Sequence, residues 1–363
     1  MDLNVLILPG DGIGQEVTAE AVAVLDRVAE VFCHSLRAAS GLIGGAAIEG
    51  AGSPLPDDTR DRAIAADTVL LGAVGAPRFD SLPPERRPER GLLELRQALG
   101  TFANLRPSRA WPALLYASPL KNAIVAGTDL VIVRELTSGL YYGTPRGVSG
   151  SGTGERAVNT LAYTRAEIER VARVAFELAQ TRRRHVTSVD KANVLENSQL
   201  WRRVVTEVAA GYPDVALEHL YVDNAAMQLV TNPRRFDVVL TENLFGDILS
   251  DEAAVLSGSI GMLASASIGE RRPTGIRPGL YEPVHGSAPD IAGRGIANPL
   301  GAIGSVAAML AYTFGLHEEA RAVEAAIDRI VQRGLRTADL GPTGRPATTS
   351  EVGQAVRDAI RGH

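Results

Sequence analysis

Short runs of branched apolar residues alternate with longer amphipathic stretches along almost the whole chain. Residues 165–180 and 198–210 place apolar side chains three and four positions apart, which predicts helices. The short runs have the length and composition of β-strands; they lie at residues 4–8, 69–74, 130–136, 185–191, 216–222 and 237–244. This alternation predicts an α/β architecture in which helices cover the strands.

The first predicted strand leads into a glycine-rich turn, "LPGDGIGQEV". The order of strand, glycines and helix is similar to the dinucleotide-binding fingerprint G-x-G-x-x-G. Here Gly10, Gly12 and Gly14 give G-x-G-x-G, and Gln15 occupies the place of the final glycine. A tight turn that needs positive φ fits this spacing better than a pyrophosphate cradle. We therefore expect a nucleotide site elsewhere in the chain.

Composition narrows the class of protein. The chain has 363 residues, of which 45% are hydrophobic and 22% charged, as in a soluble globular enzyme of two or three domains. A net charge of −5 gives no reason to expect nucleic acid or an anionic membrane as a partner. The single cysteine, Cys33, excludes an intramolecular disulfide and is expected to be buried in a helix. No basic leader precedes the first strand, so a cytoplasmic location is expected.

Two segments interrupt or extend the pattern. Residues 146–158 are rich in glycine and serine, which predicts an exposed arm rather than a domain boundary. Residues 299–316 are the most apolar stretch but contain Gly, Ser, Thr and Tyr. A helix buried in a core or subunit contact explains that stretch better than a membrane span.

Three aspartates are candidate metal ligands. Asp247 and Asp251 are four residues apart at a predicted helix start, so they share one face. Adjacent carboxylates repel one another unless a cation lies between them, and their hard oxygens suit Mg²⁺ or Mn²⁺. Asp223 ends a predicted strand, where α/β active sites tend to gather. Their spacing alone does not exclude the alternative that these aspartates are solvated and bind no metal.

Three arginines, Arg96, Arg106 and Arg134, lie at loops or strand ends. A guanidinium binds carboxylates bidentately, so a cluster of three would suit a dicarboxylate ligand. Independent surface salt bridges are the simpler explanation from these residues alone. Lys191 and Tyr141 would form an acid–base pair if their pKa values were lowered, although isolated examples are usually structural.

A long segment near the end of the chain, residues 279–299, shows neither helical nor strand periodicity. Irregular segments of this length inside a compact domain tend to be functional. Its glycines and prolines predict a fixed backbone that wraps a flat ligand. Asp290 would then accept hydrogen bonds from a ribose diol.

Taken together, these stretches resemble the metal-dependent β-decarboxylating dehydrogenases of 2-hydroxy acids, the isocitrate/isopropylmalate dehydrogenase family. The resemblance covers nearly the whole chain and is most specific in "GDILSDE" and "EPVHGSAPDIAG". Its other parts are "LPGDGIGQEV", "GGAAI", "ERGLLELR", "FANLRP", "VREL", "LYYG", "VDKANVLE", "YPDVALEHLYVDNAAMQL" and "IANP".

The resemblance implies roles for the candidate residues. The three arginines would bind the substrate carboxylates. Asp247 and Asp251, with Asp223 of the partner subunit, would hold Mg²⁺ or Mn²⁺. Lys191, also from the partner, would take the proton of the C2 hydroxyl, and Tyr141 would protonate the enolate. The implied assembly is therefore a homodimer with shared active sites.

The resemblance also implies an NAD site on two loops, with nicotinamide near the first glycine loop and adenosine on the late loop. NADP-using relatives carry a lysine and a tyrosine in the places of Asp290 and Ile291. The residues implied to contact the cofactor are Ile13, Ala76, Pro77, Glu89, His285, Gly286, Ser287, Ala288, Pro289, Asp290, Ile291, Ala292, Gly293 and Asn298.

The implied fold is the family's α/β fold of two domains with a shared twisted sheet, which is not a Rossmann fold. Residues 1–101 and 258–363 would form a discontinuous cofactor-binding domain. Residues 102–257 would form the substrate, metal and dimerisation domain, with an arm near residues 139–160.

The substrates of this family are malates that differ in one further substituent. The segment "PERGLLELR" indicates which substituent this chain accepts. If Arg96 faces the substrate from a helix, Leu92 and Leu93 lie on the same face. Leucines there would accept an isopropyl group and would disfavour the third carboxylate of isocitrate. Glu89 is implied to border the substrate, and Arg90 is expected to face solvent.

The implied reaction is NAD-dependent oxidative decarboxylation of (2R,3S)-3-isopropylmalate to 4-methyl-2-oxopentanoate, a step of leucine biosynthesis. The alternatives within the family are D-malate, tartrate or homoisocitrate as the substrate. A metal-dependent lyase or hydrolase would use the same carboxylates but would leave the late loop unexplained. A non-catalytic relative would have lost acid, base or metal ligands, and all of these are present.

Overall fold

A computed structural model describes residues 1–341 and 345–361, and the chain divides into two compact units. Unit 1 contains residues 1–101, 111–119 and 257–363, and unit 2 contains residues 102–110 and 120–256. Residues 111–119 thus pack with unit 1, whereas the sequence placed them in the second domain. The functions assigned to the two domains stay predictions.

The sheet strands of unit 1 follow the order β2, β1, β3, β12, β11. The pairs formed by β1, β2, β3 and β12 are parallel, whereas β11 runs antiparallel to β12. Every residue of β3 is buried, as is typical of a parallel strand covered on both faces. The bounds are Asp2–Gly10 for β1, Ser35–Ser40 for β2, Thr68–Ala73 for β3, Ala264–Ile268 for β11 and Gly279–Pro283 for β12.

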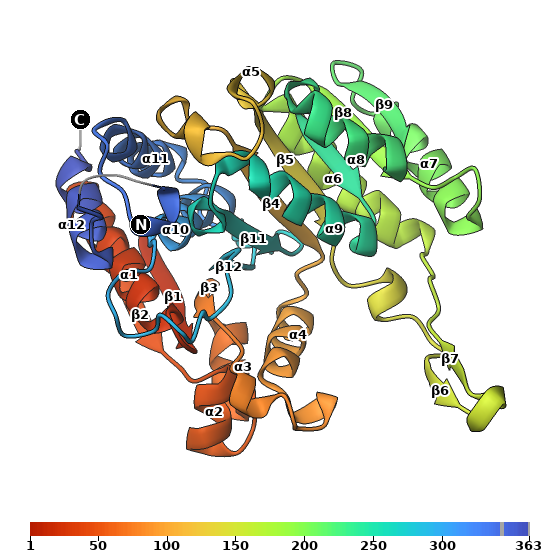
Figure 1. Cartoon of the computed structure of the whole chain (residues 1–363), viewed down its shortest axis with the longest axis horizontal. Helices are drawn as coiled ribbons and strands as arrows, with labels where there is room; N and C mark the ends of the chain where they lie inside the picture. Colours follow the sequence, from red (N-terminus) through yellow and green to blue (C-terminus); the bar gives the residue numbers. More distant parts are fainter. Residues whose placement is uncertain (342–344, 362–363) are drawn as a thin grey trace. The chain divides into compact units, whose positions relative to one another are not determined.

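Helices of unit 1 pack around these strands, and α10 contacts α1, α11, β11 and β12 (Figure 1). Most residues of α10 are buried, so the prediction of a core helix at residues 299–316 is confirmed. No helix in the described residues has the length and apolarity needed to cross a membrane. The helices are α1 Gly14–Val31, α2 Gly44–Ala51, α3 Asp57–Ala65, α4 Pro88–Leu99, α10 Leu300–Tyr312, α11 His317–Gln332 and α12 Thr349–Ala359.

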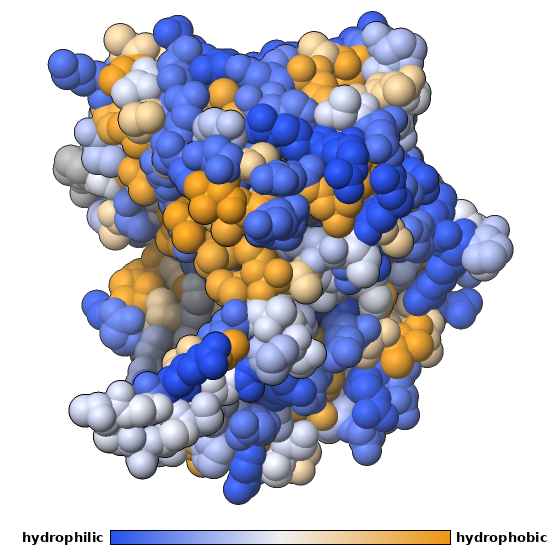
Figure 2. All heavy atoms as spheres, turned by 90° about the vertical axis from the view of Figure 1, so that its right-hand side faces the viewer, coloured by the Kyte–Doolittle hydropathy of each residue, from blue (hydrophilic) through white to orange (hydrophobic). Residues whose placement is uncertain are grey.

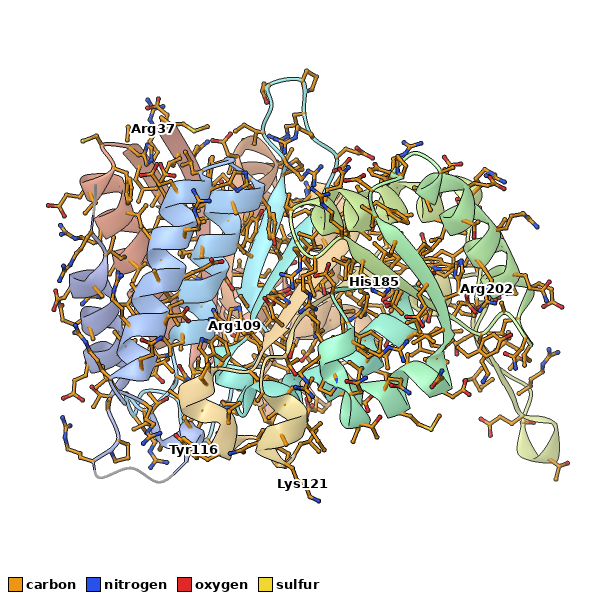
Figure 3. The ribbon with its side chains drawn as sticks, turned by 90° about the horizontal axis from the view of Figure 1, so that it is seen from above. Arg37, Arg109, Tyr116, Lys121, His185 and Arg202 are labelled. Atoms are coloured by element: carbon orange, nitrogen blue, oxygen red, sulfur yellow. The ribbon has the colours of Figure 1, made fainter. Side chains whose placement is uncertain are left out.

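The sheet strands of unit 2 follow the order β4, β5, β10, β8, β9, and all neighbours except β4 and β5 pair in parallel. Viewed from above, α6 and α7 lie on one side of these strands and α8 and α9 on the other (Figure 3). The strands are β4 Ala103–Arg109, β5 Asp129–Glu135, β8 His185–Asp190, β9 Ala216–Tyr221 and β10 Val238–Thr241. The helices are α5 Asn122–Val125, α6 Arg165–Gln180, α7 Glu196–Ala209, α8 Val222–Thr231 and α9 Asn243–Ala254.

An exposed antiparallel hairpin forms where the sequence predicts an arm. Its strands are β6, Gly147–Ser149, and β7, Arg156–Val158. The ribbon shows the hairpin extending away from the helices of unit 2 (Figure 1). The glycines and serines of this segment therefore belong to a projecting element rather than to a linker between units.

Two expectations from the sequence are wrong. Cys33 is exposed, because α1 ends at Val31 and Cys33 lies in the following turn with a φ of 55°. The late segment is not irregular throughout, because its first residues, 279–283, form β12 between β3 and β11. The irregular part is residues 284–299, between β12 and α10.

The glycine loop between β1 and α1 is a tight turn, as the sequence predicts. Gly10 and Gly12 have φ angles of 69° and 56°. A Cβ on Gly12 would lie 2.0 Å from the carbonyl oxygen of Ser287, so only glycine fits there. The N–H groups of Asp11 and Ile13 already donate to backbone carbonyls, that of Ile13 to Ser287 at 2.8 Å. These amides are not available to a phosphate.

Candidate active site

The predicted active-site residues of unit 2 follow the carboxyl ends of its parallel strands. Arg134 is the penultimate residue of β5, and Lys191 comes directly after β8. Asp223 is in the first turn of α8, directly after β9. Helix α9, which carries Asp247, follows β10. Because parallel strands end at one edge of a sheet, the topology brings these side chains to the same edge.

Two arginines pair with two carboxylates of α9. Arg134 donates to Asp247, and Arg106 Nη1 lies 3.3 Å from Asp251 Oδ1. The Arg134 side chain is only 5% exposed, whereas that of Asp251 is 69% exposed. Arg106 and Arg134 are therefore not independent surface salt bridges. We call Arg106, Arg134, Tyr141, Asp247 and Asp251 the α9 group.

Tyr141 joins this group through its hydroxyl, which donates to Asp247 Oδ2 at 2.8 Å. Its ring lies 5.6 Å from the Arg134 guanidinium carbon. Burial, followed by the hydrogen bond and charge of Asp247, raises the pKa of Tyr141 to about 12. The pKa of Tyr141 is thus raised, whereas the sequence analysis expected a lowered value for an acid–base pair, and the phenol is protonated near neutral pH.

Asparagines hold both arginines, and the sequence analysis did not identify them. Arg134 Nε donates to Asn243 Oδ1 at 2.9 Å, and Arg106 Nε donates to Asn104 Oδ1 at 2.9 Å. Asn104 is two residues before Arg106 in β4, so the shared strand face is a local signal that could have revealed it. Asn243 is the first residue of α9 and had no such signal.

A buried network fixes the start of α9. Glu242 is the N-cap residue and accepts a hydrogen bond from Phe245 N at 2.6 Å. The Tyr163 hydroxyl lies 3.4 Å from Glu242 Oε2 and accepts from Asn243 N at 2.9 Å. Burial raises the pKa of Glu242, although the backbone donors oppose this shift. Because the network sets the helix start, it also sets the positions of both aspartates.

Lys191 and Asp223 form a separate pair, with 2.5 Å between Lys191 Nζ and Asp223 Oδ1. The hydrogen bond from Lys191 is the main cause of the lowered pKa of Asp223. In the described residues, the hydrogen bonds of these two side chains join them to each other and not to the α9 group. Within one chain, the predicted base is therefore not in contact with the predicted acid.

The backbone before and after Lys191 is anchored by Asp190, which is almost fully buried. Arg202 of α7 (Figure 3) donates to both carboxylate oxygens of Asp190, each at 2.9 Å. Asp190 Oδ1 also accepts from Ala192 N at 2.9 Å. This bidentate pair holds the turn that presents Lys191.

The donor atoms of α9 fit a hard divalent cation but do not complete its coordination. Asp247 and Asp251 supply carboxylate oxygens on one helix face, which suit Mg²⁺ or Mn²⁺. The described residues contain no group of three or more His, Cys, Asp or Glu side chains that could hold a metal. Asp223 of the same chain therefore does not form such a group with Asp247 and Asp251 in the described residues.

The predicted substrate residues of unit 1 lie on α4. Arg96 Nη2 is 2.6 Å from Glu282 Oε1, and Arg96 Nε is buried with no hydrogen-bond partner among the described residues. Leu92 packs against the core of unit 1, whereas Leu93 is exposed. Arg90 pairs with exposed Glu94 and faces solvent, as expected.

The predicted adenosine loop in unit 1 contains a histidine with an unused acceptor. His285 Nδ1 is 2.9 Å from the Gly286 carbonyl oxygen, and within the part of the chain that the structure describes His285 Nε2 is buried and has no hydrogen-bond partner. Burial lowers the pKa of His285, which favours the neutral imidazole. With Nδ1 donating, Nε2 remains an acceptor for a ligand N–H, as an adenine amine would supply.

Two other residues of this loop differ in exposure. The Asn298 amide is buried, where it donates to Asp339 Oδ2 at 3.0 Å. Asp290 is exposed, and so is Arg294. The carboxylate of Asp290 is therefore accessible to a ribose, and Asn298 fixes the end of the loop before α10.

Comparisons with known proteins agree with this architecture. A family model described as "Isocitrate/isopropylmalate dehydrogenase" matches residues 4–356. The chain is 55% identical over 362 residues to a 3-isopropylmalate dehydrogenase of Halalkalibacterium halodurans, covering 99% of this chain and 98% of that protein. It is 55% identical over 363 residues to one of Pseudomonas fluorescens, covering 99% of each.

Solved structures show the same fold. The chain superimposes on isocitrate dehydrogenase from Methylococcus capsulatus with a TM-score of 0.85 and 36% identity, covering 99% of both chains. A β-decarboxylating dehydrogenase from Thermococcus kodakarensis, in its apo form, gives a TM-score of 0.80 and 39% identity. That match covers 99% of this chain and 96% of the other. These similarities confirm the predicted fold class.

Proposed function

The chain belongs to the isocitrate/isopropylmalate dehydrogenase family, and on that basis we propose that it oxidises and decarboxylates 3-isopropylmalate with NAD⁺ in leucine biosynthesis. Relatives named 3-isopropylmalate dehydrogenase at 55% identity over nearly the whole chain support this substrate. The observation that carries the proposal is the α9 group, in which two arginines, two carboxylates and a protonated tyrosine meet at one helix. A cytoplasmic location stays a prediction.

The reaction needs a hydride acceptor and a cation. NAD⁺ would accept the hydride of C2. Bound Mg²⁺ or Mn²⁺, held by Asp247 and Asp251 with Asp223 of the partner subunit, would stabilise negative charge on the C2 oxygen in both oxidation and decarboxylation. Arg106 and Arg134 would bind the substrate carboxylates through their planar guanidinium groups. The role of Arg96 as a third residue that binds the substrate carboxylates stays a prediction.

Two proton transfers accompany the reaction. The Lys191 amine takes the proton of the C2 hydroxyl as hydride leaves C2. The bond between C3 and its carboxylate then breaks and CO₂ leaves. The electron pair of that bond stays on the substrate and forms the enolate. The Tyr141 hydroxyl donates its proton to C3, which gives 4-methyl-2-oxopentanoate. The contact of the Tyr141 hydroxyl with Asp247 places this proton beside the proposed metal ligand.

A homodimer would join the Lys191–Asp223 pair of one chain to the α9 group of another. Helices α8 and α9 pack together and expose Met227, Val230 and Ile248, and Val255, directly after α9, is exposed as well. The space-filling view shows apolar atoms gathered in a band on one face of the molecule (Figure 2). Exposed apolar groups of this kind mark interaction surfaces, and a second copy of this chain is the occupant we propose.

The substrate assignment is tested with a panel of malates in the presence of NAD⁺ and Mn²⁺. We expect kcat/KM for 3-isopropylmalate to exceed that for D-malate, tartrate, homoisocitrate and isocitrate by at least about tenfold, because each methyl group buried against Leu92 and Leu93, the predicted contacts of the isopropyl group, adds to the difference. Absorbance of NADH gives the rates. A higher kcat/KM for any other member of the panel would overturn the assignment, and absence of NADH with all of them would overturn the proposed reaction.

A preference for NAD⁺ over NADP⁺ follows from Asp290 and Ile291. The exposed carboxylate can accept hydrogen bonds from the ribose hydroxyls, whereas it repels a 2′-phosphate. We expect a preference of at least about a hundredfold in kcat/KM, or roughly 2.7 kcal/mol. Asp290→Lys with Ile291→Tyr adds a cation and a phenol donor, so it should narrow or reverse the preference. Equal use of both cofactors by the unmodified enzyme would contradict this interpretation of the loop.

A further inference from the structure

Asp11 lies at the centre of the glycine loop and has no part in the function described so far. We propose that Asp11 is a positioning residue for NAD⁺ binding, because its carboxylate ties the glycine loop, which carries Ile13, to α2 and to the segment that carries Ala76 and Pro77. The proposal rests on the proposed function for the identity of the cofactor. The contacts of Asp11 lie entirely within unit 1.

The Asp11 carboxylate is buried and accepts three backbone hydrogen bonds. Its Oδ2 accepts from Gly45 N at 2.8 Å and from Gly75 N at 2.9 Å. Its Oδ1 accepts from Ala46 N at 2.8 Å. Asp11 is 6% exposed, and no cationic side chain of the described residues forms an ion pair with it. Backbone amides therefore replace the water and the counterion that a buried carboxylate otherwise needs.

Two of these amides belong to the first turn of α2. A helix N-terminus presents free N–H groups and a partial positive charge, so it attracts an anion. In this protein the anion is the internal carboxylate of Asp11 rather than a phosphate of the ligand. The Asp11 carboxylate thus holds the glycine loop to the first turn of α2 and uses two free N–H groups of that turn.

The approach of Asp11 to α2 requires glycine. Gly44 precedes Gly45 in "GGAAI" and has a φ of 73°. A Cβ on Gly44 would lie 2.6 Å from Asp11 Oδ2, closer than a carbon and an oxygen can approach. This part of the sequence is therefore shaped around the carboxylate.

Predicted cofactor contacts lie directly after one segment bound by the Asp11 carboxylate and within the glycine loop itself. Gly75 is followed directly by Ala76 and Pro77. On the other side of Asp11, Ile13 donates its N–H to the Ser287 carbonyl oxygen of the adenosine loop at 2.8 Å. The carboxylate uses both oxygens on protein amides, so its effect on the cofactor is indirect, through the spacing of these backbone segments.

The sharpest test replaces Asp11 by asparagine, which keeps the volume but changes one oxygen to a donor. Either orientation of the amide directs its NH₂ group at one or two backbone N–H groups. We expect the KM for NAD⁺ to rise by at least about tenfold, with the KM for 3-isopropylmalate and the half-activating Mn²⁺ concentration within about twofold. Asp61→Asn, an exposed carboxylate in α3 of the same unit, is the matched control and should change none of these values.

Calorimetric titration with NAD⁺ separates this proposal from the proposed function. If the unmodified enzyme binds NAD⁺ but does not oxidise 3-isopropylmalate, the proposed substrate is wrong. Weaker NAD⁺ binding by Asp11→Asn would still support the positioning role of Asp11. An unchanged affinity for NAD⁺ in folded Asp11→Asn overturns the positioning role of Asp11. If that variant does not fold, Asp11→Glu retains the charge but displaces the carboxylate, and the same rise in KM for NAD⁺ is expected. An unchanged KM in that variant overturns the proposal.

Discussion

Replacing Asp247 with asparagine is expected to lower kcat/KM at limiting Mn²⁺ by at least about a thousandfold, equivalent to roughly 4 kcal/mol. The substitution removes one of the two negative charges on the α9 face that offset a divalent cation. It also takes a carboxylate from Arg134 and from the Tyr141 hydroxyl. We expect a large rise in the half-activating Mn²⁺ concentration, together with a fall in kcat.

The measurement is steady-state turnover over a range of Mn²⁺ and Mg²⁺ after treatment with a chelator. The chelated unmodified enzyme should be inactive and should recover when either ion is returned. Asp214→Asn is the control, since Asp214 is an exposed carboxylate of unit 2 that contacts Gln180. Full turnover in chelator, or an unchanged half-activating concentration in Asp247→Asn, would contradict the metal assignment.

Helix α6 shows which parts of the fold follow directly from the sequence. Its apolar spacing and its capping box, formed by Thr164 and Glu167, are local features, so residues 165–180 could be identified from the sequence alone. The predicted strands at β1, β3, β5, β8 and β10 are confirmed for a similar reason, since each is rich in branched residues; the prediction of β9, "ALEHLY", is confirmed as well.

The strands that the sequence analysis missed depend on their partners. Strand β2, "SLRAAS", is largely exposed and has no apolar run. Strand β11, "ASASI", consists mostly of small residues that are buried only because neighbouring elements cover them. Pairing with a distant strand is a non-local interaction, which composition within a short window does not reveal.

The candidate site divides in the same way. The spacing of Asp247 and Asp251 is local and predicts their shared helix face. The pairing of Arg134 with Asp247 joins β5 to α9 across more than a hundred residues, and no local pattern indicated it. The near-complete burial of Arg134 distinguishes it from an arginine in a surface salt bridge, and burial of a charged side chain is decided by tertiary packing.

Mixing two inactive variants, Lys191→Ala and Tyr141→Phe, is expected to restore activity. Each substitution alone removes an acid or base and should lower kcat by about a hundredfold to ten-thousandfold. In a heterodimer of the two, one site would combine the intact Tyr141 of one chain with the intact Lys191 of the other. Random exchange of subunits in a twofold symmetric dimer would then give about a quarter of the unmodified activity.

The matched control mixes Lys191→Ala with Asp223→Asn. These residues are in contact within one chain, with 2.5 Å between Nζ and Oδ1, so they enter the same site together. Every site of that heterodimer retains one of the two substitutions, and no recovery is expected. Recovery in the first mixture but not in the second requires that Lys191 and Tyr141 act from different subunits. If subunit exchange is verified by mass spectrometry and neither mixture recovers, the acid and base belong to one chain. The Lys191–Asp223 pair would then have to reach the α9 group by movement within unit 2.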